Sequence, residues 1–158
     1  MNKLLVSLLL TLGVSGIAQA AGAVVVGDAA AGQAKTAVCG ACHGPDGNSM
    51  APNFPKLAGQ GDRYLLKQLH EIKDGKRQVL EMTGLLANLN DQDLADIAAY
   101  YSSQKGSVGA ADPALVAQGE ALFRGGNLEK GMPACIGCHS PDGQGLAAAG
   151  FPHLGGQH

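Results

Sequence analysis

The chain contains no tryptophan and has only three tyrosines and three phenylalanines among its 158 residues. Glycine, by contrast, occurs 24 times. A chain of this length allows one domain or two small ones. Two domains of fewer than about 100 residues with so few large apolar side chains would have marginal hydrophobic cores. The composition therefore favours a protein whose core is completed by a bound apolar group or by cross-links.

The chain also lacks an excess of charge of either sign. Lysine and arginine together number 11, aspartate and glutamate number 13, and the net charge is −2. There is no stripe of basic residues of the kind that binds nucleic acid. We therefore expect no nucleic-acid partner.

A long apolar run is present only at the N-terminus. Residues 4–17 are mostly apolar, Lys3 precedes them, and Ala18-Gln19-Ala20 matches an A-x-A cleavage site. The run is shorter than the roughly 20 residues that span a membrane. We predict that residues 1–20 are a signal peptide and that the mature protein is exported to the periplasm. No integral membrane segment is then expected, which leaves peripheral association with a membrane open.

The four cysteines fall into two matching patterns, Cys39-Gly40-Ala41-Cys42-His43 and Cys135-Ile136-Gly137-Cys138-His139. Residues three apart on a helical turn share a face, with roughly 5–6 Å between their Cβ atoms. Two such thiols can each add to a vinyl group of one haem, and the next histidine can reach the iron from the same side. This spacing is the attachment signature of c-type haem. The sequence predicts two covalent haem c groups, attached through Cys39, Cys42, Cys135 and Cys138, with His43 and His139 as proximal iron ligands.

Three other uses of the cysteines deserve comparison. Disulfides are common in exported proteins, but a disulfide framework gives no reason for a histidine after each pair. A Cys/His zinc site requires neither the repeated pattern nor a histidine directly after the cysteine. A thioredoxin-like dithiol belongs to a fold with strands, and the sequence shows no convincing strand alternation.

The distal iron ligand must be another side chain with a lone pair. Met82 lies in an irregular stretch between two expected helices, and that stretch can fold across the opposite face of the first haem. We predict Met82 as this ligand, because a His/Met pair fills both axial positions and favours electron transfer. The remaining candidates are Met50, Met132, His70, His153 and His158, of which His153 or His158 would be the alternative for the second haem.

Helical patterns predict an all-α fold. The first helix is expected from the N-cap Asp28 to about residue 38, with Gly32 at a close helix crossing. A second is expected over residues 62–74, and a third from the N-cap Asn90 to Gln104. A fourth should follow Pro113 over residues 114–124, where Gly119 mirrors Gly32.

The repeat continues beyond the cysteines. Three further segments occur twice: Pro45-Asp46-Gly47 and Pro141-Asp142-Gly143, Phe54-Pro55-x-Leu57 and Phe151-Pro152-x-Leu154, Gly59-Gln60 and Gly156-Gln157. Such self-similarity predicts two copies of one domain. We expect a first domain at residues 21–105, a linker at 106–112 and a second domain at 113–158. Counterparts of Met82 and of the third helix would fall beyond His158, so we expect this second domain to be incomplete through C-terminal truncation.

These residues together resemble the dihaem cytochrome c4 family. The resemblance extends from Asp28 to the end of the chain and includes residues 38–44, 53–60, 85–96 and 99–101. It implies two tandem class I cytochrome c domains and Met82 as the sixth ligand of the first haem. It further implies that the carbonyls of Pro55 and Pro152 accept hydrogen bonds from the proximal histidines, and that Gly32 meets Tyr100 or Tyr101.

The resemblance also implies a function. It predicts a periplasmic electron carrier rather than an enzyme, with a quinol–cytochrome c oxidoreductase and a terminal oxidase as redox partners. Two alternatives remain at this point. The protein could be the haem subunit of a periplasmic dehydrogenase such as a sulfide-oxidising flavoprotein, or an open second haem could bind peroxide or other small ligands.

Overall fold

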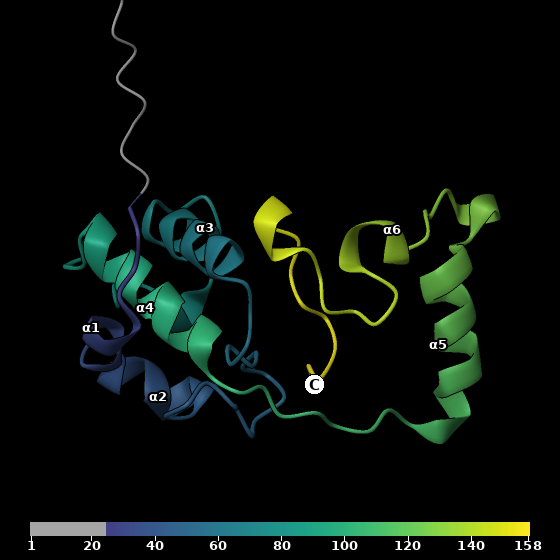
Figure 1. Ribbon diagram of the computed structural model, residues 1–158, viewed down its shortest axis with the longest axis horizontal. Helices are drawn as coiled ribbons and strands as arrows, with labels where there is room; N and C mark the ends of the chain where they lie inside the picture. Colours follow the sequence, from purple (N-terminus) through teal and green to yellow (C-terminus); the bar gives the residue numbers. More distant parts are fainter. Residues whose placement is uncertain (1–24) are drawn as a thin grey trace, which may run out of the picture.

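A computed structural model describes residues 25–158; the predicted signal peptide lies outside them. Four helices lie in the first part of the molecule: α1 (Ala29–Gln33), α2 (Ala37–His43), α3 (Asp62–Lys73) and α4 (Asp91–Ser103), together with the 3₁₀ turn η1 (Leu80–Met82). The second part has α5 (Pro113–Gly125), η2 (Leu128–Lys130), α6 (Ile136–His139) and η3 (Ala147–Ala149) (Figure 1). Between residues 25 and 158 the only β pairing is two isolated bridges. The predicted all-α fold is confirmed.

The prediction of one helix from Asp28 to about residue 38 is wrong. Asp28 does cap the helix, accepting hydrogen bonds from the amides of Ala30 and Ala31, but α1 ends at Gln33. The Thr36 hydroxyl donates to the Gln33 carbonyl at 2.9 Å, and this oxygen would accept from residue 37 in a continuous helix. The chain therefore breaks and restarts as α2, which carries the first cysteine pair.

The core of the first part forms where α1 and α3 pack against α4. Gly32 lies at the crossing of α1 and α4, where an added Cβ would be 2.0 Å from the carbonyl oxygen of Asp96 and 2.9 Å from the Cβ of Tyr100. The predicted close crossing, with Tyr100 as the neighbour, is confirmed. Beneath it, the largest fully buried side chains of the described residues are Tyr101, Leu94 and Ile97.

A charge network joins the residues that flank α1 to α4. Lys35 bridges Asp93 and Asp96, with 2.6 Å from its Nζ to a carboxylate oxygen of each. The buried Asp96 carboxylate also accepts from the Asp28 amide and from Gln92, each at 2.8 Å. The hydrogen bond from the Asp28 amide, then those from Lys35 and Gln92, lower the pKa of Asp96 to about 2.

The later helices begin and end close to the predicted positions. α4 starts with a capping box in which Asn90 and Asp93 bond each other's backbone amides. α3 ends at Lys73, one residue before the predicted end. α5 begins at Pro113, as the position of the proline suggested.

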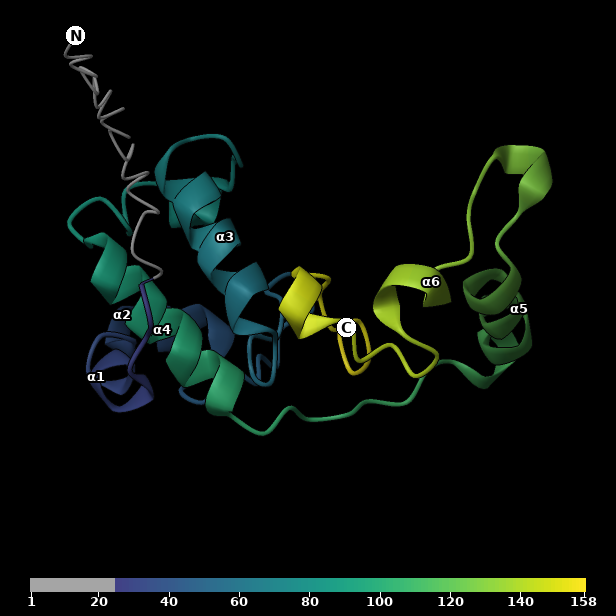
Figure 2. The same ribbon diagram turned by 45° about the horizontal axis from the view of Figure 1, so that its top comes forward.

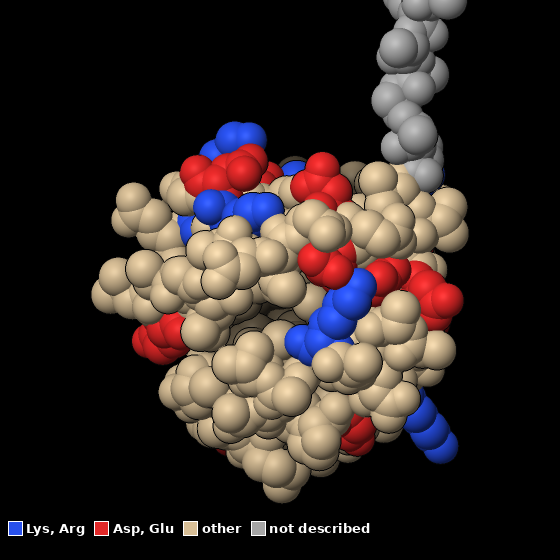
Figure 3. Space-filling model, turned by 90° about the vertical axis from the view of Figure 1, so that its left-hand side faces the viewer, with Lys and Arg blue, Asp and Glu red and all other residues tan. Residues whose placement is uncertain are grey.

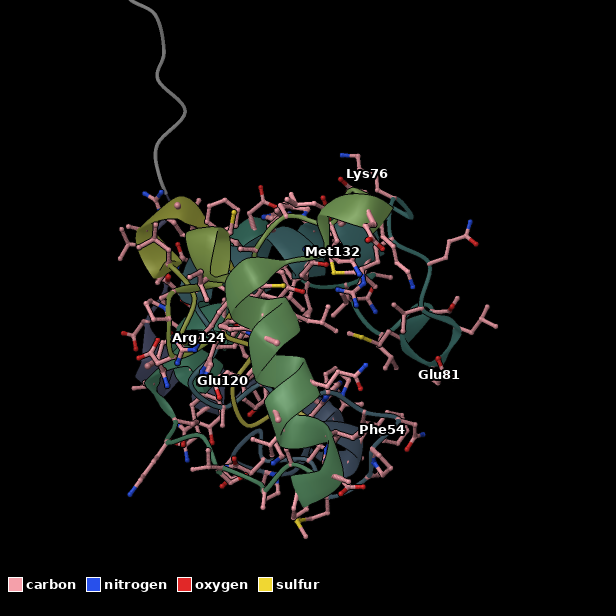
Figure 4. The ribbon with its side chains drawn as sticks, turned by 90° about the vertical axis from the view of Figure 1, so that its right-hand side faces the viewer. Phe54, Lys76, Glu81, Glu120, Arg124 and Met132 are labelled. Atoms are coloured by element: carbon pink, nitrogen blue, oxygen red, sulfur yellow. The ribbon has the colours of Figure 1, made fainter. Side chains whose placement is uncertain are left out.

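α5 lies at the far end of the molecule from α1, reached by an extended linker (Figures 1 and 2). Its Leu115 and Val116 are exposed, and Glu120 pairs with Arg124 on its surface (Figure 4). Apart from its two chain neighbours and the backbone of α5 itself, no atom in the described part of the chain lies within 4 Å of a Cβ added at Gly119. Gly119 therefore matches Gly32 in its position, since both glycines lie in the helix preceding a cysteine pair. It does not lie at a close helix crossing as Gly32 does, so this part of the prediction is wrong.

On the face shown in Figure 3, acidic and basic side chains lie beside one another across the upper part, and much of the lower part carries neither. This face has no continuous basic stripe. Across residues 25–158, none of the helices combines the length and the apolar character needed to cross a lipid bilayer.

Candidate functional site

The first part of the molecule encloses a cavity of about 460 Å³ whose wall is mainly apolar. Its volume falls within the range of roughly 300–1,000 Å³ typical of ligand and cofactor sites. Three of the predicted site residues, Cys39, Cys42 and His43, border this cavity from α2. Met82 borders it from η1. The structure therefore brings all four predicted residues of the first haem site around one cavity, closed by apolar side chains that include Leu65, Leu69, Leu86, Leu89 and Ile97.

Two neighbouring residues hold the His43 ring in place. Its Nδ1 donates to the carbonyl oxygen of Pro55 at 2.9 Å, and the edge-on Phe54 ring lies with its centroid 6.2 Å away. A proton committed to Nδ1 leaves the lone pair on Nε2 free to bind a metal. His43 is buried, so the ring has little freedom to turn. The hydrogen bond that the family resemblance implied is present.

The second cysteine pair reproduces this arrangement. Cys135 is the residue directly before α6, and Cys138 and His139 lie within the helix. The Nδ1 of His139 donates to the carbonyl oxygen of Pro152 at 2.9 Å, and the Phe151 ring lies edge-on at 6.2 Å. The sequence repeat is therefore also a repeat of geometry around each histidine. Cys135, Cys138 and His139 do not border the first cavity.

The chemistry of these side chains fits a covalently attached haem. Each pair of cysteines is free of disulfide bonds and followed by an oriented histidine. Burial raises the pKa of the Cys39 thiol and of the neighbouring Tyr101 phenol. The Tyr101 hydroxyl is buried, and no partner for it is found among the described residues. A low-dielectric wall of this kind suits a large, mostly apolar group.

The alternative distal candidates lie elsewhere. Met50 is 92% exposed, and Met132, on the loop after η2 (Figure 4), is 41% exposed. The imidazole of His70 faces Asp91 at 3.9 Å on the surface. None of these three side chains borders the cavity, and neither does His158. His153, considered for the second haem, instead borders the first cavity.

Side chains from the second part of the molecule complete the wall of the first cavity. The sequence analysis did not predict this contribution. Pro152, His153, Leu154 and Gln157 border it. The last loop lies beside the start of α3 in both ribbon views (Figures 1 and 2), and Arg63 donates to the Ala148 carbonyl at 2.7 Å.

Two glutamines bind the two parts to each other in the same way. The Gln60 side chain bonds both backbone groups of His153, and the Gln157 side chain bonds both backbone groups of Lys56. These glutamines belong to the repeated Gly-Gln segments, which was the available signal.

Comparison with known proteins identifies the family. Residues 29–105 match the family model named cytochrome c. Cytochrome c4 of Pseudomonas aeruginosa is 80% identical over 158 residues, which are 100% of this chain and 76% of that protein. The chain belongs to the cytochrome c4 family. It is a dihaem c-type cytochrome that acts in electron transfer, and its cofactor is covalently bound haem c, which excludes the zinc and dithiol alternatives.

The fold of cytochrome c4 agrees with this assignment. The crystal structure of reduced recombinant cytochrome c4 from Pseudomonas stutzeri is similar to this chain, with a TM-score of 0.82 and 70% identity. The match covers 84% of this chain and 75% of that one. A thiosulfate dehydrogenase electron acceptor from Thiomonas intermedia is 41% identical over 81% of this chain and 60% of its own length. Redox proteins are therefore its partners.

Proposed function

We propose that the protein carries single electrons in the periplasm, from a quinol-oxidising complex to a terminal oxidase. The observation that carries this proposal is the convergence of Cys39, Cys42, His43 and Met82 on one apolar cavity. A site in which the protein supplies both axial ligands leaves no iron position for a substrate. The signal peptide predicted at residues 1–20, which lies outside the described residues, supports a periplasmic location for this activity.

Each residue of the first site has its own task. Cys39 and Cys42 would hold the haem through thioethers, and His43 and Met82 would bind its iron. The bound haem supplies a one-electron Fe(III)/Fe(II) couple. The Pro55 carbonyl holds the His43 ring in one orientation, so that the ligand geometry changes little when the charge changes.

The second site uses Cys135 and Cys138 for attachment and His139 as the proximal ligand. The matching hydrogen bonds and ring distances at His43 and His139 support the assignment. We assign one haem to each predicted unit, the first at residues 21–105 and the second at residues 113–158, with 106–112 as the linker.

A second candidate function is suggested by one relative. Because the Thiomonas intermedia protein is named a thiosulfate dehydrogenase electron acceptor, the present chain could accept electrons from a periplasmic dehydrogenase. The haem chemistry would be the same, and only the electron donor would differ.

Rapid-mixing kinetics tests both candidates. The oxidised protein is mixed with the purified quinol-oxidising complex and its quinol, and in a parallel series with a thiosulfate dehydrogenase and thiosulfate. Reduction of both haems by the first donor, followed by oxidation on membranes that contain the terminal oxidase, is the expected result. Reduction by the dehydrogenase alone would replace the first proposal by the second.

A further inference from the structure

The contact between the two repeats involves the same peptide groups that hold the proximal histidines. In the first repeat, the carbonyl of Pro55 accepts from His43, and the N–H of the same peptide unit, on Lys56, donates to Oε1 of Gln157 at 3.0 Å. Nε2 of Gln157 then donates to the Lys56 carbonyl at 2.8 Å. One side chain of the second repeat therefore holds the backbone on which His43 rests.

The second repeat shows the reciprocal arrangement. The carbonyl of Pro152 accepts from His139, and the N–H of that peptide unit, on His153, donates to Oε1 of Gln60 at 2.8 Å. Nε2 of Gln60 donates to the His153 carbonyl at 2.9 Å. Lys56 and His153 occupy equivalent positions in the repeat, as do Gln60 and Gln157. The contact is thus self-complementary, as in an isologous dimer.

We infer that each glutamine is a positioning residue for the proximal histidine of the other repeat: Gln157 for His43, and Gln60 for His139. The inference deepens the proposed function, because it requires haem iron at both histidines. A histidine–peptide–glutamine chain of hydrogen bonds connects each haem site to the opposite repeat.

The physical basis is polarisation along a hydrogen-bonded chain. A bond donated by a peptide N–H makes the carbonyl of that peptide a better acceptor, with a strengthening of about 10–30% per bond. A stronger acceptor at Nδ1–H makes the imidazole a more basic ligand. A more basic ligand stabilises Fe(III) over Fe(II), and hydrogen bonds to the ligating histidine are one of the means by which proteins tune haem potentials.

Burial supports a role beyond surface adhesion. Gln60 is 5% exposed, and all four polar contacts with the opposite backbone are well-formed hydrogen bonds. Loss of either side chain would leave a peptide N–H and a carbonyl without their partners in a contact where both are partly buried. Replacing either glutamine should therefore disturb the proximal histidine of the opposite repeat more than that of its own repeat.

The test is a redox titration of the dihaem protein, followed by absorption spectroscopy. Gln157→Leu and Gln60→Leu are compared with the parent and with two matched controls, Gln118→Leu on α5 and Gln33→Leu on α1. Both control glutamines are exposed. The first haem is identified by the iron–thioether absorption that depends on Met82, and covalent haem content is measured on every sample.

Gln157→Leu should raise the potential of the first haem more than that of the second, and Gln60→Leu should do the reverse, while the controls leave both unchanged. Gln157→Glu keeps an acceptor oxygen at the Lys56 N–H, so it should hold the potential of the first haem at or below the parent value. If the contact were purely structural, Gln157→Leu and Gln157→Glu would both shift the potential of the first haem in the same direction.

Equal potentials in parent and variants, or a larger shift at the haem of the same repeat, would overturn the inference while leaving the proposed function intact. Absence of covalent haem from the parent protein would overturn the proposed function and the inference together. Should Gln157→Leu fail to fold, the opposite variant Gln60→Leu and the Gln157→Glu protein decide the question by the same comparison.

Discussion

Replacing Gly32 by alanine tests how closely α1 and α4 must approach. The added Cβ would lie 2.0 Å from the carbonyl oxygen of Asp96, a backbone atom that cannot rotate away. Restoring an ordinary separation of about 3.5 Å requires α1 to move by about 1.5 Å. Such a movement also strains the hydrogen bond from the Asp28 amide to the Asp96 carboxylate, which is 2.8 Å long.

The expected loss of stability follows from two opposing effects. Overpacking of a close contact destabilises by about 1–3 kcal/mol, and a rigid backbone neighbour places this case at the upper end. Alanine in place of glycine within a helix returns about 1 kcal/mol. The net destabilisation is about 2 kcal/mol, equivalent to a fall in Tm of about 8–16 °C for a domain of this size.

The matched control is the same substitution at Gly119, which lies in α5, the helix that precedes the second cysteine pair. A Cβ there meets nothing within 4 Å in the described part of the chain, so Gly119→Ala in this 158-residue protein should stabilise by up to about 1 kcal/mol. Urea and thermal unfolding, followed by circular dichroism and haem absorbance, measure both variants. Equal changes in the two variants would refute the packing argument.

Two further substitutions address the first haem site and the charge network. Met82→Ala should abolish the iron–thioether absorption while two covalent haems remain, and the reduced variant should bind carbon monoxide at the first haem; an unchanged spectrum would rule out Met82 as the ligand. Asp96→Asn should lower stability at neutral pH, because the folded-state pKa of about 2 lies below the unfolded value of about 3.9. The stabilisation is complete above the unfolded pKa and is lost as pH falls through the folded one, so the stability difference from the parent should shrink between about pH 4 and pH 2. Urea unfolding at a series of pH values measures it, and a constant difference across that range would contradict the assignment.

Local chemistry made much of the site predictable from sequence. The spacing within each cysteine pattern places thiols and histidine on one short helix, and the capping residues Asn90 and Asp93 mark the start of α4. The proline hydrogen bonds at His43 and His139 followed from the family resemblance. These features depend on residues close in sequence or on a repeated motif.

Features that depend on distant contacts were harder to predict. The break between α1 and α2 lies in an alanine-rich run with good helical propensity, and it is held by the Thr36 hydroxyl and by Lys35 pairing with α4. Propensity is a weak guide where tertiary contacts of this kind compete with it. The crossed glutamine contacts have no local signature, and only the repetition of Gly-Gln marked Gln60 and Gln157 for attention.

The number of covalent haems in the purified protein tests most directly whether each cysteine pair binds one haem. A pyridine haemochrome assay, calibrated against protein concentration, should give two c-type haems per chain. The Cys135→Ala/Cys138→Ala double variant should retain one of them, because Cys39 and Cys42 remain. A parent protein with no covalent haem, or a double variant that still carries two, would contradict the assignment of one haem to each cysteine pair.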